Sequence, residues 1–252
     1  MSFVIAVAGK GGTGKTTLSG LFIRTLMKRK KGPILAVDAD PNSNLPLVLG
    51  LKVDKTIGMA REEFFDSRTK IPAGMPREAV LETKLHDVLV ENRDYDLLVM
   101  GRPEGPGCYC YLNNILRKFL DVLVDNYPYS VIDNEAGMEH MSRRTTRGVD
   151  ILLIVSDQSP RGIETALQIR KLAQELNLEI KEYGLIVNRV KGALGPSLIE
   201  EIEKKGLKLA GTIPEDEIIQ DFEIRGISLV ELPDDAPAVL AVERLMGGLG
   251  II

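Results

Sequence analysis

The chain has 252 residues, of which 44% are hydrophobic and 27% charged, and its formal net charge is −4. This composition suits an ordinary buried core, and the acidic balance argues against a nucleic-acid or acidic-lipid partner. No apolar run approaches the roughly 20 residues that span a bilayer, and the N-terminus lacks the pattern of a signal peptide. We therefore expect a cytoplasmic protein with no membrane partner.

Short apolar runs alternate with amphipathic segments of helical length along the chain. The apolar runs predict strands at residues 3–8, 34–38, 97–100, 130–133, 151–155, 182–188 and 209–213. The amphipathic segments predict helices at residues 16–28, 111–126, 161–176, 196–205 and 236–246, whereas residues 52–77 predict loops with a short helix.

Most of these strand candidates are continuous apolar runs, which are typical of strands buried on both faces of a parallel sheet. The alternation predicts a single doubly wound α/β domain of three layers over residues 1–252, with a mostly parallel sheet. Ligands of such sheets bind beyond the carboxyl ends of the strands. We therefore expect the functional residues in the segments that directly follow the strands.

The first of these segments is a glycine-rich loop between a strand and a helix. It reads Gly9-Lys10-Gly11-Gly12-Thr13-Gly14-Lys15-Thr16-Thr17 and matches the phosphate-binding pattern G-x-x-x-x-G-K-[ST]. The glycines allow backbone N–H groups to surround phosphate, Lys15 would neutralise the β- and γ-phosphates, and Thr16 would ligate Mg²⁺.

The same loop also fits a dinucleotide-binding fingerprint, in which Asp38 would bind the ribose. That kind of site has no use for Lys15 and Thr16 directly after the last glycine. The sequence therefore favours a P-loop ATPase in which Gly11, Gly12, Thr13, Gly14, Lys15, Thr16 and Thr17 bind the nucleotide.

Acidic residues follow two other strands. Asp38 and Asp40 come after the second strand, and Asp133 ends a later strand, four residues before Gly137. A single Asp in such a place is ordinarily a turn or cap residue. Two carboxylate sites at the strand ends of a phosphate-loop domain instead predict that Asp38 and Asp133 serve the magnesium ion together with Thr16.

The loop from Gly9 to Thr17 resembles the deviant Walker A motif of the MinD/ParA/nitrogenase-iron-protein group. The resemblance implies that Lys10, otherwise a solvated loop charge, reaches the phosphates of the partner in a nucleotide-bridged homodimer. It also implies that Asp40 orients the attacking water and that hydrolysis is slow.

The same resemblance implies that Asn188 recognises adenine, with Arg189 and Pro214 also at the nucleotide. No N-K-x-D signature of GTP-binding proteins is present in the sequence, so ATP is the expected nucleotide.

Cys108 and Cys110 are the two cysteines of the chain. Two thiolates can chelate one metal ion, but a stable soft-metal site usually has four ligands, which a symmetric dimer supplies. The pair therefore predicts Ni²⁺ or Zn²⁺ bound between two subunits, and the sequence does not choose between the two metals. Buried thiols and a redox C-x-C pair are the alternatives, and a capping or loop role is favoured over metal binding for His140.

Residues 98–108 are similar to the segment that carries a cluster cysteine in the nitrogenase iron protein. The second cysteine which that family needs after its switch aspartate is missing from residues 133–140, so an iron–sulfur electron donor is disfavoured. The pair Cys108-x-Cys110, together with Gly137-Met138-Glu139-His140, resembles the CooC/AcsF family of nickel-insertion ATPases.

This second resemblance implies an ATP-dependent metallochaperone whose client is carbon monoxide dehydrogenase or acetyl-CoA synthase. A partition or septum-positioning ATPase is the main alternative. Members of that class that bind membranes carry a basic amphipathic C-terminal helix, whereas residues 244–252 are rich in glycine and nearly uncharged.

Overall fold

The computed structural model of the protein describes residues 2–66, 77–102, 110–135 and 148–252. The described residues form a seven-stranded sheet in the order β3-β2-β4-β1-β5-β6-β7, and each neighbouring pair is parallel. The strands are β1 (Phe3–Gly9), β2 (Ile34–Asp38), β3 (Tyr95–Val99), β4 (Tyr129–Asp133), β5 (Val149–Ser156), β6 (Ile180–Val190) and β7 (Leu209–Pro214). The doubly wound parallel fold predicted from the sequence is confirmed.

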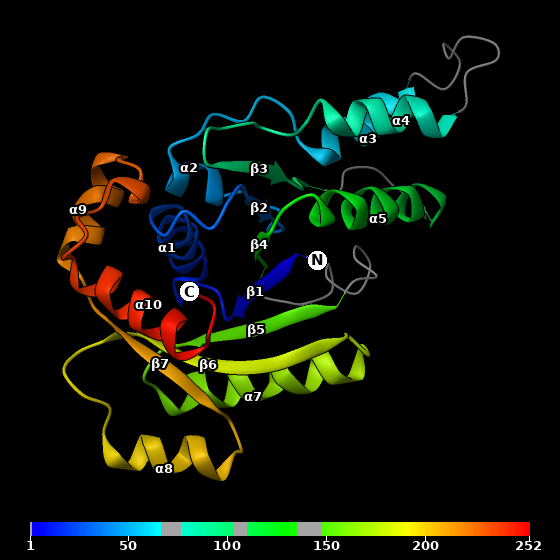
Figure 1. Ribbon diagram of the computed structural model, residues 1–252. Coiled ribbons are helices and arrows are strands. Elements are labelled where there is room, and N and C mark those ends of the chain that lie inside the picture. The colour runs from blue at the N-terminus through cyan, green and yellow to red at the C-terminus, as the bar shows by residue number, and fades with distance from the viewer. Residues whose placement is uncertain (1, 67–76, 103–109, 136–147) are drawn as a thin grey trace.

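Helices cover both faces of the sheet and produce three layers (Figure 1). One face carries α1 (Lys15–Lys28), α2 (Leu45–Leu49), α9 (Glu217–Arg225), the short 3₁₀ helix η2 (Leu229–Glu231) and α10 (Pro237–Gly248). The other face carries α3 (Ile57–Asp66), α4 (Arg77–His86), α5 (Cys110–Asp125), α7 (Pro160–Glu175) and α8 (Pro196–Lys204). Within the described ranges, none of these helices is long and apolar enough to cross a bilayer.

The central strand β1 shows why the strand candidates read as continuous apolar runs. Ile5 and Val7 pack into the core on the α1 side, whereas Val4 and Ala6 pack into the core on the α5 and α7 side. Successive residues of a strand point to opposite faces, so a strand covered on both faces needs apolar residues at every position.

The predicted strands and helices are all present, with ends within two residues of the predicted ends. Among the described residues, the helices α2, α4 and α9 and the 3₁₀ helix η2 were not predicted. Helix α2 has five residues and includes Pro46, and α9 has no fully buried side chain. Their apolar periodicity is therefore too short or too weak to be recognised.

The topology brings the carboxyl ends of β1, β2 and β4 together. Asp38 at the end of β2 is in register with Asp133 at the end of β4, and Asp133 is also paired with Val7 of β1. The chain leaves β1 toward β2 but later crosses from β4 to β5 on the other side of β1. A crevice for a ligand is expected at such a reversal of strand order.

Candidate nucleotide-binding site

The loop between β1 and α1 folds around the carbonyl oxygen of Lys10. This oxygen accepts hydrogen bonds from the Thr13 N–H at 3.4 Å, the Thr13 hydroxyl at 2.8 Å and Lys15 Nζ at 3.3 Å. Gly14 is the N-cap of α1 and provides no side-chain cap, and the first turn of the helix contains no acidic residue. The N-terminal N–H groups of α1 are thus left for an external anion, which the helix dipole also favours.

Two residues of β6 support this loop from the side. Asn188 is buried, and its Nδ2 donates to the Thr13 carbonyl at 2.8 Å, while Arg189 Nη1 donates to the Gly12 carbonyl at 3.3 Å. Gly14 has φ 89°, and a Cβ atom there would lie 2.4 Å from Asn188 Nδ2, so this position requires glycine.

The resemblance in sequence implies that Asn188 and Arg189 lie at the nucleotide, but the sequence does not indicate their contacts with the loop. An amide that donates to the Thr13 carbonyl orders the phosphate loop directly. Recognition of adenine by Asn188 stays a prediction.

Asp133 lies beside the N-terminal end of α1 and is almost completely buried. Its carboxylate accepts hydrogen bonds from the Thr16 hydroxyl and from Ser19 Oγ, the latter at 3.3 Å. Burial raises the pKa of Asp133 to about 6, although Thr16 and the charge of Lys15 act in the opposite direction. A buried carboxylate beside a hydroxyl is the oxygen donor set that Mg²⁺ takes.

Asp38 is fully buried and anchors the segment that follows β2. Its Oδ1 accepts from the Asp40 N–H at 3.1 Å, and its Oδ2 accepts from the Leu45 N–H at the start of α2 at 2.9 Å. Burial raises the pKa of Asp38 to about 7, and repulsion by Asp133 adds to this shift. The structure thus shows Asp38 shaping the loop that carries Asp40, and its predicted contact with magnesium stays a prediction.

Asp40 is partly exposed at the edge of the same crevice. Its Oδ1 accepts from the backbone N–H of Asn42 at 2.9 Å and from Asn42 Nδ2 at 3.0 Å. These contacts fix the carboxylate at the wall of the cavity beside the phosphate loop.

Two adjoining cavities lie among the phosphate loop, the segment after β2 and helix α9. The larger, of about 530 Å³, is lined by Gly11, Gly12, Gly14, Lys15, Thr16, Thr17, Asp40, Pro41, Asn42, Asn44, Val48, Glu135, Arg189 and Glu223. The smaller, of about 260 Å³, is lined by Thr17, Leu18, Leu21, Asn188, Arg189, Ile213, Pro214, Glu215, Asp216, Ile219, Gln220 and Glu223.

The two cavities differ in chemistry and meet at three shared residues. The larger surrounds the phosphate loop, and the smaller includes the apolar side chains of Leu18, Leu21 and several neighbours. At the boundary, the Thr17 hydroxyl donates to Glu223 Oε1 at 2.9 Å. A polar cavity joined to a partly apolar one fits the phosphates and the base of one nucleotide. Glu223 was not predicted as a site residue because the sequence gives too weak a signal for α9.

The cysteine prediction falls largely outside the described residues. Cys110 is the first residue of α5, whereas Cys108, Gly137 and His140 are not among the residues that the structure describes. Within the described part of the chain, no group of three or more His, Cys, Asp or Glu residues is placed to hold a metal ion.

The parallel sheet, the glycine loop and the two cavities define a P-loop nucleotide-binding protein. Residues 4–230 match the family described as the CobQ/CobB/MinD/ParA nucleotide binding domain. The chain belongs to this family and is an ATP-binding ATPase.

Several relatives match nearly the whole chain. An uncharacterized ATP-binding protein of Methanocaldococcus jannaschii is 46% identical over 96% of both chains. The carbon monoxide dehydrogenase accessory protein CooC of Rhodospirillum rubrum is 33% identical over 94% of both chains. Among solved structures, the MinD cell division protein of Aquifex aeolicus is 25% identical with a TM-score of 0.68, covering 98% of this chain and 97% of its own.

Proposed function

We propose that the protein is an ATP-dependent metallochaperone that acts as a homodimer and carries Ni²⁺ or Zn²⁺ on Cys108 and Cys110 of each subunit. Its client would be carbon monoxide dehydrogenase or acetyl-CoA synthase. The similarity to the carbon monoxide dehydrogenase accessory protein of Rhodospirillum rubrum supports this choice over a septum or partition ATPase.

In this proposal, the phosphates of ATP lie at the loop and the base enters the smaller cavity. Lys15 would leave the Lys10 carbonyl, which it contacts at 3.3 Å, and bind the β- and γ-phosphates instead. Thr16 and Asp133 would hold Mg²⁺, which neutralises phosphate charge. Asp40, fixed by Asn42, would orient the attacking water.

The face around the cavities has features suited to a second copy of the chain. Lys10 is exposed there, as the action of this lysine on the partner's nucleotide requires. Leu47 of α2 is 73% exposed and Ile224 of α9 is 85% exposed, and each is adjacent in sequence to a cavity-lining residue. Exposed large apolar side chains beside a binding site favour a protein–protein contact.

The metal part of the proposal is supported by the way in which the chain is anchored on each side of the cysteines. Before them, the backbone N–H of Met100 donates to the Asp38 carbonyl at 2.9 Å, directly after β3. After them, α5 begins at Cys110, and the strand that follows α5 ends at Asp133. Both sides of the cysteine segment are therefore tied to acidic residues of the nucleotide site, which offers a route for coupling metal release to hydrolysis.

The test is a metal titration in the presence of Mg²⁺ and a non-hydrolysable ATP analogue. We expect the wild type to bind one Ni²⁺ or Zn²⁺ per two chains and the Cys108→Ala/Cys110→Ala variant to lose this binding while still binding ATP, since thiolates are the soft ligands of the proposed site. His140→Ala is the matched control and should bind metal like the wild type. Full metal binding by the double cysteine variant would contradict the proposal.

A further inference from the structure

Helix α9 forms one wall of the smaller cavity and is only partly buried against the core. It contributes Ile219, Gln220 and Glu223 to the cavity lining, yet none of its side chains is fully buried. Ile218, Ile219 and Phe222 pack against the core but are only partly buried, so they stabilise the position of α9 less than fully buried side chains would. The position of α9 therefore also depends on how its two ends are held.

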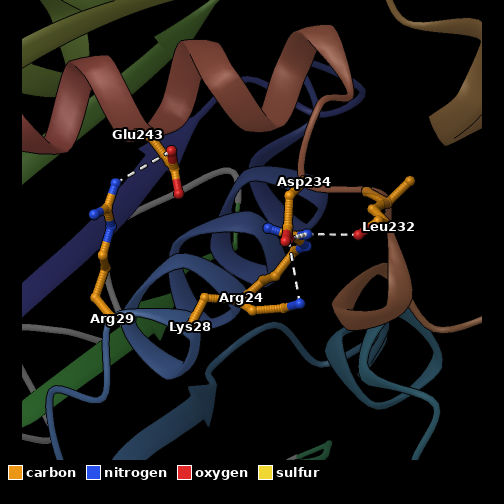
Figure 2. A network of polar contacts seen from close by, with 6 residues as sticks. All are labelled: Arg24, Lys28, Arg29, Leu232, Asp234 and Glu243. Atoms are coloured by element: carbon orange, nitrogen blue, oxygen red, sulfur yellow. Dashed lines mark hydrogen bonds and ion pairs between the residues drawn. The ribbon is translucent and has the colours of Figure 1, made fainter.

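The C-terminal end of α9 leads directly into a segment that α1 holds. Gly226 ends the helix in the left-handed conformation, and η2 follows at once. Ser228, between the two, donates from its hydroxyl to the Val48 carbonyl at 3.4 Å. Residues 232–234 come next and pack beside α1 (Figure 2).

Arg24 of α1 makes the central contact with this segment. Its Nη2 donates to the Leu232 carbonyl and to Asp234 Oδ1, both at 2.5 Å (Figure 2). Arg24 is 1% exposed, and a buried guanidinium on such acceptors forms strong, charge-assisted hydrogen bonds. Lys28 Nζ lies 3.2 Å from the same carboxylate oxygen but is half exposed, so its contribution is small.

Helix α1 also begins at the phosphate loop, so one rigid element holds both parts of the site. Arg24 lies roughly 14 Å along the helix from Lys15, at about 1.5 Å per residue. The first turn of α1 borders the larger cavity. Arg24, further along the same helix, holds residues 232–234, which follow the α9 wall of the smaller cavity in the chain. The guanidinium itself touches neither cavity.

We propose that Arg24 is a positioning residue for nucleotide binding. By holding residues 232–234 against α1, Arg24 keeps α9 in place as a wall of the smaller cavity. This inference rests on the proposed location of the base in the smaller cavity. It predicts that loss of Arg24 weakens the binding of the nucleoside part of ATP and leaves the binding of the phosphates unchanged.

The test compares two ligands, Mg-ATP and Mg-tripolyphosphate, by calorimetry on the full chain, together with ATPase kinetics. For Arg24→Gln we expect ATP affinity to fall about tenfold, or about 1.4 kcal/mol, with KM raised and kcat close to that of the wild type. Tripolyphosphate affinity should not change, and Arg24→Lys should recover most of the ATP affinity. A merely structural role would lower the active fraction without changing KM.

Arg29→Gln is the matched control, because Arg29 directly follows α1 as its C-cap but pairs with Glu243 of α10, at 3.3 Å, on the surface (Figure 2). It should bind both ligands like the wild type. If Arg24→Gln does not fold, Asp234→Asn replaces it, since Asp234 is exposed and its loss should give a smaller weakening of ATP binding alone.

The experiment distinguishes a failure of the proposed position of the base from a failure of the proposed role of Arg24. A wild type that binds ATP no more tightly than tripolyphosphate would contradict the proposed base cavity. A wild type that prefers ATP, with variants at Arg24 and Asp234 that keep the full preference, would overturn the role of Arg24 alone.

Discussion

Asp38 and Asp133 end neighbouring strands and lie buried beside the phosphate loop. Their position could be predicted from the sequence, because each directly follows an apolar run in a parallel sheet. The hydrogen bond from Asn188 to Thr13 could not, since it joins residues 175 positions apart in the chain. Local motifs indicate which residues are expected at the ligand, whereas contacts that support a loop from a distant strand depend on the finished fold.

The raised pKa values of this pair predict how stability changes with pH. Burial raises the pKa of Asp38 to about 7 and that of Asp133 to about 6, both above the ordinary value of 3.8, so the folded state binds these protons more tightly than the unfolded state. Their stabilising contribution is fully present below about pH 4 and is lost as the pH rises through the folded pKa values. Without Mg²⁺ and nucleotide, we expect the free energy of unfolding to fall between about pH 5 and about pH 8.

Urea unfolding at several pH values measures this slope. Asp38→Asn should flatten it, because one of the two titrating groups is removed, even if the variant is less stable overall. Exposed Asp54 provides the control, since Asp54→Asn should keep the wild-type slope. An unchanged slope in Asp38→Asn would show that this carboxyl group does not titrate as the structure indicates.

Among the helices, α9 and α10 share an anchor that was not visible in the sequence. Asp216 Oδ1 accepts from the Ile218 N–H at the start of α9 at 3.0 Å, and its Oδ2 accepts from the Ala238 N–H at the start of α10 at 2.9 Å. The cap on α9 is local, but the cap on α10 crosses 22 positions and depends on the packing of α10 against β7.

Because one carboxylate caps two helices, Asp216→Ala should destabilise the protein by about 2 kcal/mol, at about 1 kcal/mol for each lost cap. Ser159→Ala is the matched control: Ser159 caps α7 alone, by accepting from the Gly162 N–H at 3.0 Å, and should cost about 1 kcal/mol. Urea unfolding of both variants provides the comparison. Equal losses would show that the second cap contributes nothing.

At the scale of the whole molecule, the sequence predicted the class of fold because the apolar runs and helical segments alternate without interruption. It did not predict the strand order, because β2 and β4 pair across ninety intervening residues and nothing local encodes that choice. The proposed homodimer belongs to this scale too, since in the proposal the exposed Lys10 acts on the partner's nucleotide and one pair of cysteines supplies only half of the metal ligands.

In the proposed function, nucleotide brings two chains together around one metal ion. Light scattering combined with metal analysis tests it, on protein with Mg²⁺, a non-hydrolysable ATP analogue and Ni²⁺ or Zn²⁺. We expect a particle of twice the mass of one chain that holds one metal ion per two chains, and a monomer when Lys10→Ala removes the lysine that is proposed to act across the interface. A single chain that binds a metal ion by itself, or a dimer that binds none, would contradict it.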